Sequence, residues 1–320
     1  MPAGHAVLTL IIAFAVAALL NAQGMHKSAL SQPPGIQRDV GGTLTAGLAA
    51  LSGVLQTDEP RALLKSALGR AGDDRINTKV VFDAPRRRAA ATTARPAKPL
   101  YTPAHPMRPY VTGDSLITDP GPVILDRTAQ DPAVKAVAAT DTHPATGLVQ
   151  PAVFNWFAYL PQQIDDLKPD LSVVTFGAND GLGFDDVAGA EDFGTPQWQA
   201  EYRRRVAGVM DTFVDRHSKL VWVGLPIPRD TGLAKRWELM NRIVATEAAK
   251  RAGDVTFAPI FDRFKNRAGR YADHLPDASG QLQLARSSDG IHYEQFGADI
   301  VTDAVIRAIP TLVRLRPPLR

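Results

Sequence analysis

Short apolar runs typical of β-strands alternate with longer stretches of helical periodicity over the last two-thirds of the chain. The apolar runs occupy residues 110–112, 133–139, 171–176, 219–225 and 255–261. The helical stretches occupy residues 151–167, 196–217 and 233–253, and a last one starts near Glu294 and runs towards Ile309. Strands that alternate with helices at this rhythm predict an α/β fold whose parallel sheet carries crossover helices on both faces.

The N-terminal third has a different pattern. Residues 6–22 are almost wholly apolar, and this length lies between the about 7–15 residues of a signal-peptide core and the roughly 20 of a bilayer span. We interpret residues 1–24 as a membrane anchor or a signal peptide, with a buried helix of a soluble domain as the alternative. With either of the first two, we expect the bulk of the chain to lie outside the cytoplasm, exported or held in the membrane through this segment.

The remaining chain divides by composition into three parts. Residues 25–82 contain leucines at helical spacing and are predicted to form a short helical juxtamembrane region. Residues 83–108 are rich in Pro, Ala and Arg without periodicity, which is typical of a linker. The strand–helix alternation of residues 109–320 predicts one α/β domain.

Composition excludes several kinds of site. The 320 residues contain no cysteine, so disulfides, thiolate nucleophiles and cysteine–zinc sites are absent. The formal net charge of +3 is small for this length, and we expect no nucleic-acid partner. No Gly-Lys pair is present for a phosphate-binding P-loop, and no His-Glu-x-x-His zinc motif occurs.

Polar residues and glycines follow the predicted strands where ligands bind in such sheets, beyond the carboxyl ends of the strands. Ser115 follows the first strand in Gly-Asp-Ser, Gly147 lies in the loop after the second, and Asn179 follows the third. Asp289 and His292 share the loop before the last helix. Each of these segments alone is more typical of a turn, a helix cap or a loop, but four of them at one edge predict a common site.

These residue types fit acyl transfer. The Ser115 hydroxyl needs a base to remove its proton, and His292 is the candidate. Asp289, three residues earlier, can hold the imidazole in the required tautomer. The backbone N–H groups of Ser115 and Gly147 and the amide of Asn179 are candidates for an oxyanion hole. An α/β-hydrolase would instead need a Gly-x-Ser-x-Gly pentapeptide, which the chain lacks.

The four segments resemble the sequence blocks of the SGNH hydrolases, also called the GDSL lipase/esterase superfamily. The matching residues are Gly113-Asp114-Ser115-Leu116, Gly147, Gly177-Ala178-Asn179-Asp180 and Asp289-Gly290-Ile291-His292. The resemblance implies a three-layer α/β/α sandwich with a flavodoxin-like, five-stranded parallel sheet. With its N-terminal segment and linker, the chain is similar to envelope-located bacterial members, which implies a place on the extracytoplasmic side of a bacterial cell envelope. It also implies Ser115 as nucleophile, His292 as base with Asp289, and Ser115, Gly147 and Asn179 at the oxyanion hole, without metal or cofactor. The sequence departs from the family at residues 119–122, Asp-Pro-Gly-Pro, where we expect the following helix to restart near Pro122.

The expected activity is hydrolysis of short-chain esters, acetyl above all, with a cell-envelope carbohydrate as candidate substrate. The alternatives are an O-acyltransferase acting on a surface polysaccharide and a catalytically silent envelope binding protein of the same fold. The glycine-rich acidic loop at residues 181–194 is expected to shape the pocket. Four aromatic residues are candidates for sugar stacking, although core packing is the commoner role: Trp156, Phe157, Trp198 and Trp237.

Overall fold

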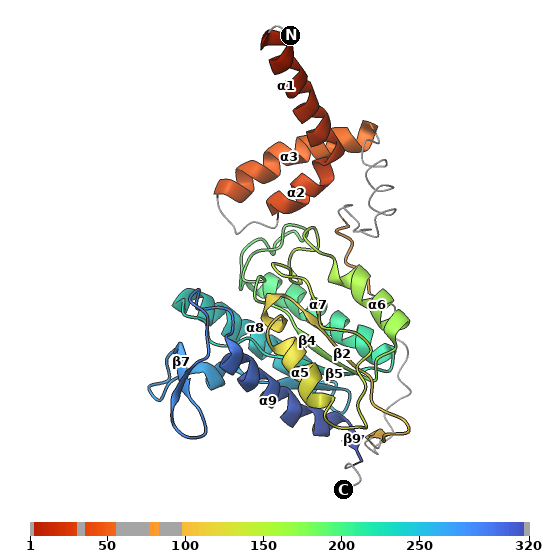
Figure 1. The fold of residues 1–320 in the computed structure, drawn as a ribbon, viewed down its shortest axis with the longest axis vertical. Coiled ribbons are helices and arrows are strands. Elements are labelled where there is room, and N and C mark those ends of the chain that lie inside the picture. Colours follow the sequence, from red (N-terminus) through yellow and green to blue (C-terminus); the bar gives the residue numbers. More distant parts are fainter. Residues whose placement is uncertain (1–2, 31–35, 56–76, 83–97, 317–320) are drawn as a thin grey trace. The chain divides into compact units, whose positions relative to one another are not determined.

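The computed structural model describes residues 3–30, 36–55, 77–82 and 98–316 (Figure 1). The chain divides into two compact units. One comprises residues 1–78 with 152–154, and the other comprises residues 79–151 with 155–320. Most of the predicted linker, residues 83–97, lies outside the described residues, as do residues 31–35 and 56–76 of the predicted juxtamembrane region.

The first unit is helical. Its helices are α1 (Ala3–Leu20), α2 (Ala22–Leu30) and α3 (Ile36–Leu55), and α2 packs against α3. The His26 ring and the Thr45 hydroxyl, 2.9 Å apart, join these two helices. Among the described residues, no single helix is long and apolar enough to cross a membrane, whereas α1 and α2 meet that criterion together but are bent by 71°. The anchor or signal peptide at residues 1–24 stays a prediction.

The second unit contains the predicted parallel sheet, and its α/β/α fold is confirmed (Figure 1). Five parallel strands lie in the order β3-β2-β4-β5-β6. Their bounds are β2 (Pro109–Gly113), β3 (Asp141–Thr142), β4 (Leu171–Thr175), β5 (Lys219–Val223) and β6 (Val255–Ala258). The side chains of β2 and β4 are entirely buried, as expected for central strands covered on both faces.

Helices cover both faces of this sheet (Figure 1). One face carries α5 (Pro120–Thr128) and α9 (Gln295–Leu312). The other carries α6 (Trp156–Leu167), α7 (Pro196–Asp215) and α8 (Thr231–Ala249). The expected restart of a helix near Pro122 is wrong by two residues, because Pro120 already occupies the first helical position, where a missing N–H is harmless.

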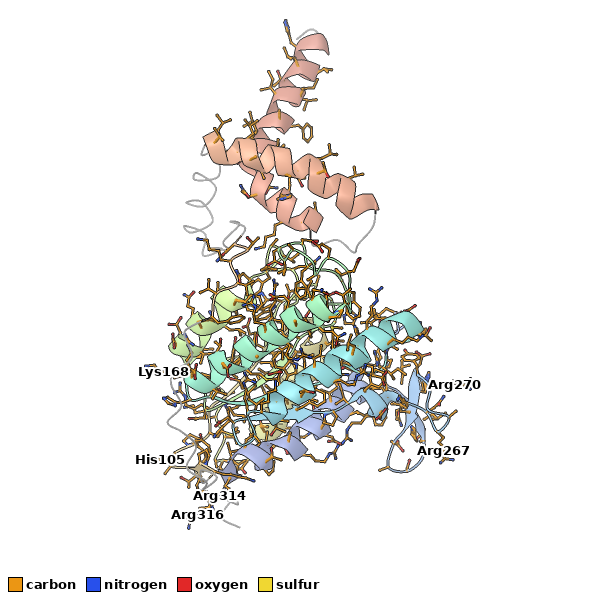
Figure 2. The ribbon with its side chains drawn as sticks, turned by 180° about the vertical axis from the view of Figure 1, so that it is seen from behind. His105, Lys168, Arg267, Arg270, Arg314 and Arg316 are labelled. Atoms are coloured by element: carbon orange, nitrogen blue, oxygen red, sulfur yellow. The ribbon has the colours of Figure 1, made fainter. Side chains whose placement is uncertain are left out.

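Two short pairs of strands lie outside the main sheet. β1 (Leu100–Tyr101) pairs in parallel with β9 (Arg314–Leu315), and β7 (His274–Pro276) pairs antiparallel with β8 (Leu282–Leu284). The turn η2 (Phe261–Phe264) precedes β7. The exposed side chains of Arg267 and Arg270 lie on the segment between η2 and β7, at the margin of the unit (Figure 2).

The predicted strand at residues 133–139 is wrong, and the edge strand is β3, at Asp141–Thr142. Residues 133–137 do run beside the chain that leads into β2, with backbone bonds to Met107 and Pro109. Pro109 has no N–H to donate, so a regular ladder cannot continue through it. Pairing becomes regular only where β3 meets the carboxyl end of β2.

One carboxylate holds this short edge strand. Asp141 accepts hydrogen bonds from the hydroxyls of Tyr110, Thr112 and Tyr159, and its other oxygen lies 3.0 Å from the His143 ring. A two-residue strand forms few backbone bonds, and these side-chain bonds supply further attachment. They direct the chain towards the loop that contains Gly147.

Burial of the aromatic side chains tests the candidates for sugar stacking. Four tryptophans of this unit are at most 1% exposed, and Phe157 is 5% exposed. The four are Trp156, Trp198, Trp222 and Trp237. The predicted sugar-stacking candidates are therefore core residues, and no ring among them offers an open face.

Candidate active site

The nucleophile candidate lies on a sharp turn at the end of β2. Gly113 adopts a φ of +153°, and a Cβ there would lie 2.2 Å from the Thr175 carbonyl oxygen, so only glycine fits beside β4. Asp114 follows and caps the short helix η1 (Ser115–Ile117) by accepting from the Leu116 N–H at 2.9 Å. Ser115 is thus held at the first position of η1, just beyond the carboxyl end of β2.

Asp114 also joins this turn to the Gly177–Asp180 turn that follows β4. Its second oxygen accepts from the Ala178 N–H at 3.0 Å, while the Asp114 N–H donates to Thr175. The side chain is fully buried, and burial raises the pKa of the Asp114 carboxyl to about 7. Asp114 is therefore a buried connector between the two turns that carry Ser115 and Asn179.

The predicted hydroxyl, imidazole and carboxylate lie in one hydrogen-bonded chain. The His292 Nε2 lies 2.8 Å from the Ser115 Oγ, and the His292 Nδ1 lies 2.6 Å from the Asp289 Oδ2. Residues separated by 177 positions in the sequence thus meet at hydrogen-bonding distance. This is the geometry required for a serine made nucleophilic by a histidine that a carboxylate orients.

The loop before α9 fixes the Asp289 carboxylate. Its second oxygen accepts from the backbone N–H groups of Ile291 (2.7 Å) and His292 (3.0 Å) and from the Ser287 hydroxyl. Burial raises the pKa of the Asp289 carboxyl, but the bonds from the His292 ring and the two N–H groups outweigh it and hold that pKa well below its usual range. The carboxylate is therefore ionised where the imidazole would acquire its proton.

Arg286 supports this loop, and sequence reasoning missed it. The side chain is 1% exposed and donates to the backbone carbonyls of Ile227, Gly290, Ile291 and His292. Three rings surround its guanidinium with centroids 5.0–5.5 Å away: Phe264, Tyr271 and Tyr293. No local pattern marks this arginine, because its partners are main-chain atoms whose position depends on the fold.

The two remaining oxyanion candidates, Asn179 and Gly147, lie on loops that are bonded to each other. The Asn179 amide donates to the Thr146 carbonyl at 2.9 Å, and the Asp180 Oδ1 accepts from the Val149 N–H at 2.9 Å. Asp180 is fully buried, and burial raises the pKa of its carboxyl to about 6. Residues 146–149 are therefore fixed against the turn that carries Asn179.

Gly147 is required by this close approach. A Cβ at residue 147 would lie 2.1 Å from the Asp180 Oδ1, well inside van der Waals contact. Gly177 lies at a φ of +122° in the same turn, and its carbonyl accepts from the Asp180 N–H at 3.0 Å. The four glycine and aspartate positions predicted to support the site thus shape the loops around it.

Among the described residues, no group of three or more His, Cys, Asp or Glu side chains could hold a metal ion. His143, at the same edge of the sheet, is bonded to Asp141 and packs its ring edge-on against Trp156 and Tyr159.

Comparison with solved structures finds similar chains at low sequence identity. One is TesA, 19% identical, with 64% of this chain and 100% of that chain covered and a TM-score of 0.46. Another is a catalytic mutant of Axe2, an acetylxylan esterase from Geobacillus stearothermophilus, 14% identical, with 66% and 97% covered and a TM-score of 0.46. A GDSL-like lipase from Bacteroides thetaiotaomicron VPI-5482 is 13% identical, with 68% and 91% covered and a TM-score of 0.42.

Comparison by sequence gives two further results. No curated protein matches the chain. A protein family does match, over residues 108–308, which include β2, the five site candidates and most of α9. Since this match covers well over half of the 320 residues, the chain belongs to the family described as protein of unknown function DUF459.

Proposed function

We propose that this protein is a serine ester hydrolase in which Ser115 is the nucleophile and His292 the general base, oriented by Asp289. One observation carries the proposal: the continuous hydrogen-bonded chain from the Asp289 Oδ2 through both nitrogens of His292 to the Ser115 Oγ, at 2.6 and 2.8 Å. Both distances fall in the range that direct proton transfer requires.

The first half of the reaction is acylation. The Ser115 Oγ attacks the ester carbonyl carbon while its proton passes to the His292 Nε2, and the carbonyl π electrons move to the oxygen to give a tetrahedral oxyanion. The ionised Asp289 stabilises the resulting imidazolium without taking its proton. Collapse of the intermediate breaks the bond to the alcohol oxygen, which takes the proton from His292 and leaves as a neutral alcohol. An acyl-serine remains.

The second half is deacylation. His292 removes a proton from water, whose oxygen attacks the acyl carbon. Collapse of the second tetrahedral intermediate breaks the bond to the Ser115 oxygen, which takes the proton back from His292, and the carboxylic acid is released. An acceptor hydroxyl in place of water would give acyl transfer by the same proton movements. How well the site excludes water from the acyl-serine decides between hydrolysis and acyl transfer, and we propose hydrolysis for this protein.

The geometry of Asn179 supports its proposed place in the oxyanion hole. A carboxamide nitrogen carries two N–H groups about 120° apart, and the bond to the Thr146 carbonyl uses one of them. The other N–H is left for the oxyanion, and we propose that it binds this oxygen together with the backbone N–H groups of Ser115 and Gly147.

A short acyl group, acetyl above all, is the proposed acyl part, and a cell-envelope carbohydrate is the proposed alcohol. The sequence supports the first because it contains no long apolar lid suited to a fatty acyl chain. The apolar helix α1 supports an envelope location, since Val7, Ile11 and Phe14 are each more than half exposed. Fusion of residues 1–24 to an enzyme that folds only outside the cytoplasm tests this location, and a fusion that stays inactive would contradict it.

Active-site labelling tests the proposed chemistry. A fluorophosphonate probe should attach to Ser115, identified by mass spectrometry of the labelled peptide, and the adduct should be lost in Ser115→Ala and His292→Ala. Ser288→Ala is the matched control, because this exposed serine lies on the same loop as Asp289 and should not change labelling. A folded protein that neither labels nor hydrolyses an aryl acetate would leave the silent binding protein as the better reading.

A further inference from the structure

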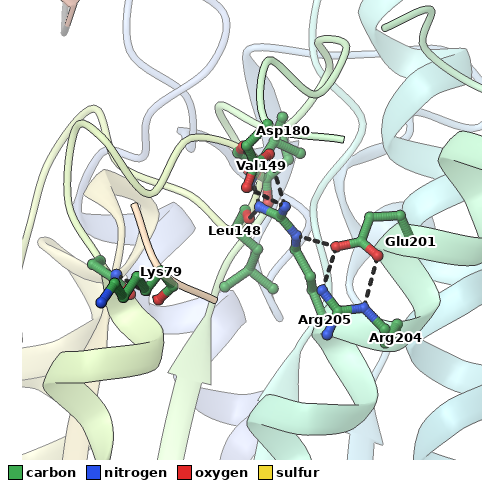
Figure 3. A network of polar contacts seen from close by, with 9 residues as sticks. Lys79, Leu148, Val149, Asp180, Glu201, Arg204 and Arg205 are labelled. Atoms are coloured by element: carbon green, nitrogen blue, oxygen red, sulfur yellow. Dashed lines mark hydrogen bonds and ion pairs between the residues drawn. The ribbon is translucent and has the colours of Figure 1, made fainter. Parts of the chain in front are cut away.

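Arg205 is a buried arginine beside residues 146–149, the oxyanion loop, and lies outside all four sequence blocks. It lies on α7 and is 0% exposed, and its guanidinium donates to the backbone carbonyls of Leu148 at 2.8 Å and Val149 at 3.3 Å (Figure 3). These carbonyls belong to the residues directly after Gly147. A buried guanidinium directed at main-chain oxygens of a loop fixes that loop by charge-assisted hydrogen bonds.

The same segment is held from its other side by Asp180. The Asp180 Oδ1 accepts from the Val149 N–H at 2.9 Å and touches Gly147 so closely that no Cβ fits there. Leu148 and Val149 thus have their N–H groups bonded to a buried carboxylate and their carbonyls bonded to a buried guanidinium (Figure 3). Because the two residues that follow it are bonded in this way, Gly147 has little freedom to move, and its own N–H is left for the oxyanion.

Arg205 is itself rigidly held. Its Nε donates to Glu201 one turn earlier on α7 at 2.7 Å, and its Nη2 donates to both oxygens of Asp186 at 2.7 and 2.8 Å. The guanidinium lies over the ring of Phe184 at 4.4 Å from the centroid. Asp186 and Phe184 belong to the loop at residues 181–194, so this loop and the oxyanion loop share one cation.

We infer that Arg205 is a positioning residue that holds the Gly147 N–H in place for the oxyanion, and that Asp186 couples the 181–194 loop to this placement. The inference rests on the proposed function, because it assigns a role within that reaction. Arg205 touches no reacting atom. Its effect should therefore fall on the transition state, where the oxyanion exists, more than on binding of the neutral ester.

Arg204 supplies a matched control. It is the next residue on α7 and binds the same Glu201, with bonds of 2.7 Å from both Nε and Nη2, but no bond joins it to residues 147–149 (Figure 3). Its side chain is 49% exposed. Arg204→Met therefore removes a guanidinium from the same helix and the same carboxylate without releasing the oxyanion loop.

The experiment compares kcat and KM of Arg205→Met, Arg205→Lys and Arg204→Met for an aryl acetate. Loss of one oxyanion donor lowers turnover by about 10²–10³-fold and a shift of about 1 Å by about 10²-fold, so we expect kcat of Arg205→Met to fall by about 10–100-fold. KM should change less than kcat, and Arg204→Met should keep wild-type kcat. Arg205→Lys should lie between, since one ammonium cannot reproduce the planar fork.

A double variant tests whether Arg205 acts on kcat through the loop that contains Gly147. In the background of Gly147→Ala, which displaces the same loop, Arg205→Met should lower kcat by a much smaller factor than in wild type. An equal factor in both backgrounds, or equal kcat for Arg205→Met and Arg204→Met in an active enzyme, would overturn the role of Arg205 alone. An inactive wild type would overturn the proposed function with it. If Arg205→Met does not fold, Asp186→Asn replaces it, with a smaller fall in kcat expected and unchanged kcat contradicting the inference.

Discussion

Substitution of Gly147 by alanine tests whether this loop belongs to the oxyanion hole. The new Cβ would lie 2.1 Å from the Asp180 Oδ1, where ordinary contact begins at 3.4 Å, so the two groups must separate by roughly 1.3 Å. Asp180 is buried and bonded to Val149 and cannot rotate into solvent. Residue 147 must therefore move, and a displacement of about 1 Å at a catalytic group costs about 10²-fold in rate.

The assay is steady-state hydrolysis of an aryl acetate, with urea unfolding measured on the same preparations. We expect kcat of Gly147→Ala to fall by about 10²-fold and the free energy of unfolding by about 1–3 kcal/mol, the usual range for overpacking. Gly53→Ala is the control. Nothing lies within 4 Å of a Cβ there, and alanine favours the α3 helix, so neither activity nor stability should decrease.

Two results would refute this reasoning. Wild-type kcat in Gly147→Ala would show that the loop lies away from the developing charge, whatever the change in stability. A fall in kcat explained wholly by unfolded protein would show only that the site is crowded. A folded variant with wild-type KM and lowered kcat is the outcome that the geometry predicts.

Four further variants test other parts of the structure. Asp289→Asn should lower kcat by about 10³–10⁴-fold, measured under saturating aryl acetate, because an amide no longer selects the His292 tautomer. Asp114→Asn tests the raised pKa of about 7 for the Asp114 carboxyl. Because the folded protein binds this proton more tightly than the unfolded chain, the unfolding free energy of the wild type relative to the variant should fall as pH rises from about 4 to 7. Urea titrations at several pH values measure this difference. Arg286→Met should lower unfolding free energy by at least about 2 kcal/mol, because it leaves buried carbonyls unpaired. Asp141→Ala should speed hydrogen exchange of the edge strand, measured by mass spectrometry.

Strand–helix periodicity was enough to predict the parallel sheet, since strands such as β2 and β4 are buried on both faces and are therefore largely apolar. The edge strand was not predictable in this way. Residues 133–139 are apolar, but Pro109 interrupts regular pairing beside them, and the polar pair Asp141–Thr142 forms the strand instead. Its attachment through the Asp141 side chain depends on tyrosines that a local pattern cannot place.

The site was predictable to the extent that it is built from short motifs. Gly-Asp-Ser and Asp-Gly-Ile-His contain within a few residues both the functional group and the turn residues that aim it, as the two backbone bonds to the Asp289 Oδ1 illustrate. That the two motifs lie near each other in the fold follows from the rule that loops meet at the carboxyl edge of a parallel sheet. Their direct contact, at 2.8 Å between His292 and Ser115, required coordinates.

Four buried charged side chains, two inside the motifs and two outside them, fix the loops of the site. Asp114 and Asp180 each accept backbone N–H groups, and Arg205 and Arg286 each donate to backbone carbonyls, with all four side chains at most 1% exposed. Burial of a charge is unfavourable unless hydrogen bonds compensate for it, so these groups weaken stability unless the loops close around them in one arrangement. Loops fixed in this way do not have to reorganise when the oxyanion forms, which is the property that electrostatic catalysis requires. Rigidity of the catalytic loops, rather than added stability, is therefore the function that we assign to the four buried charges.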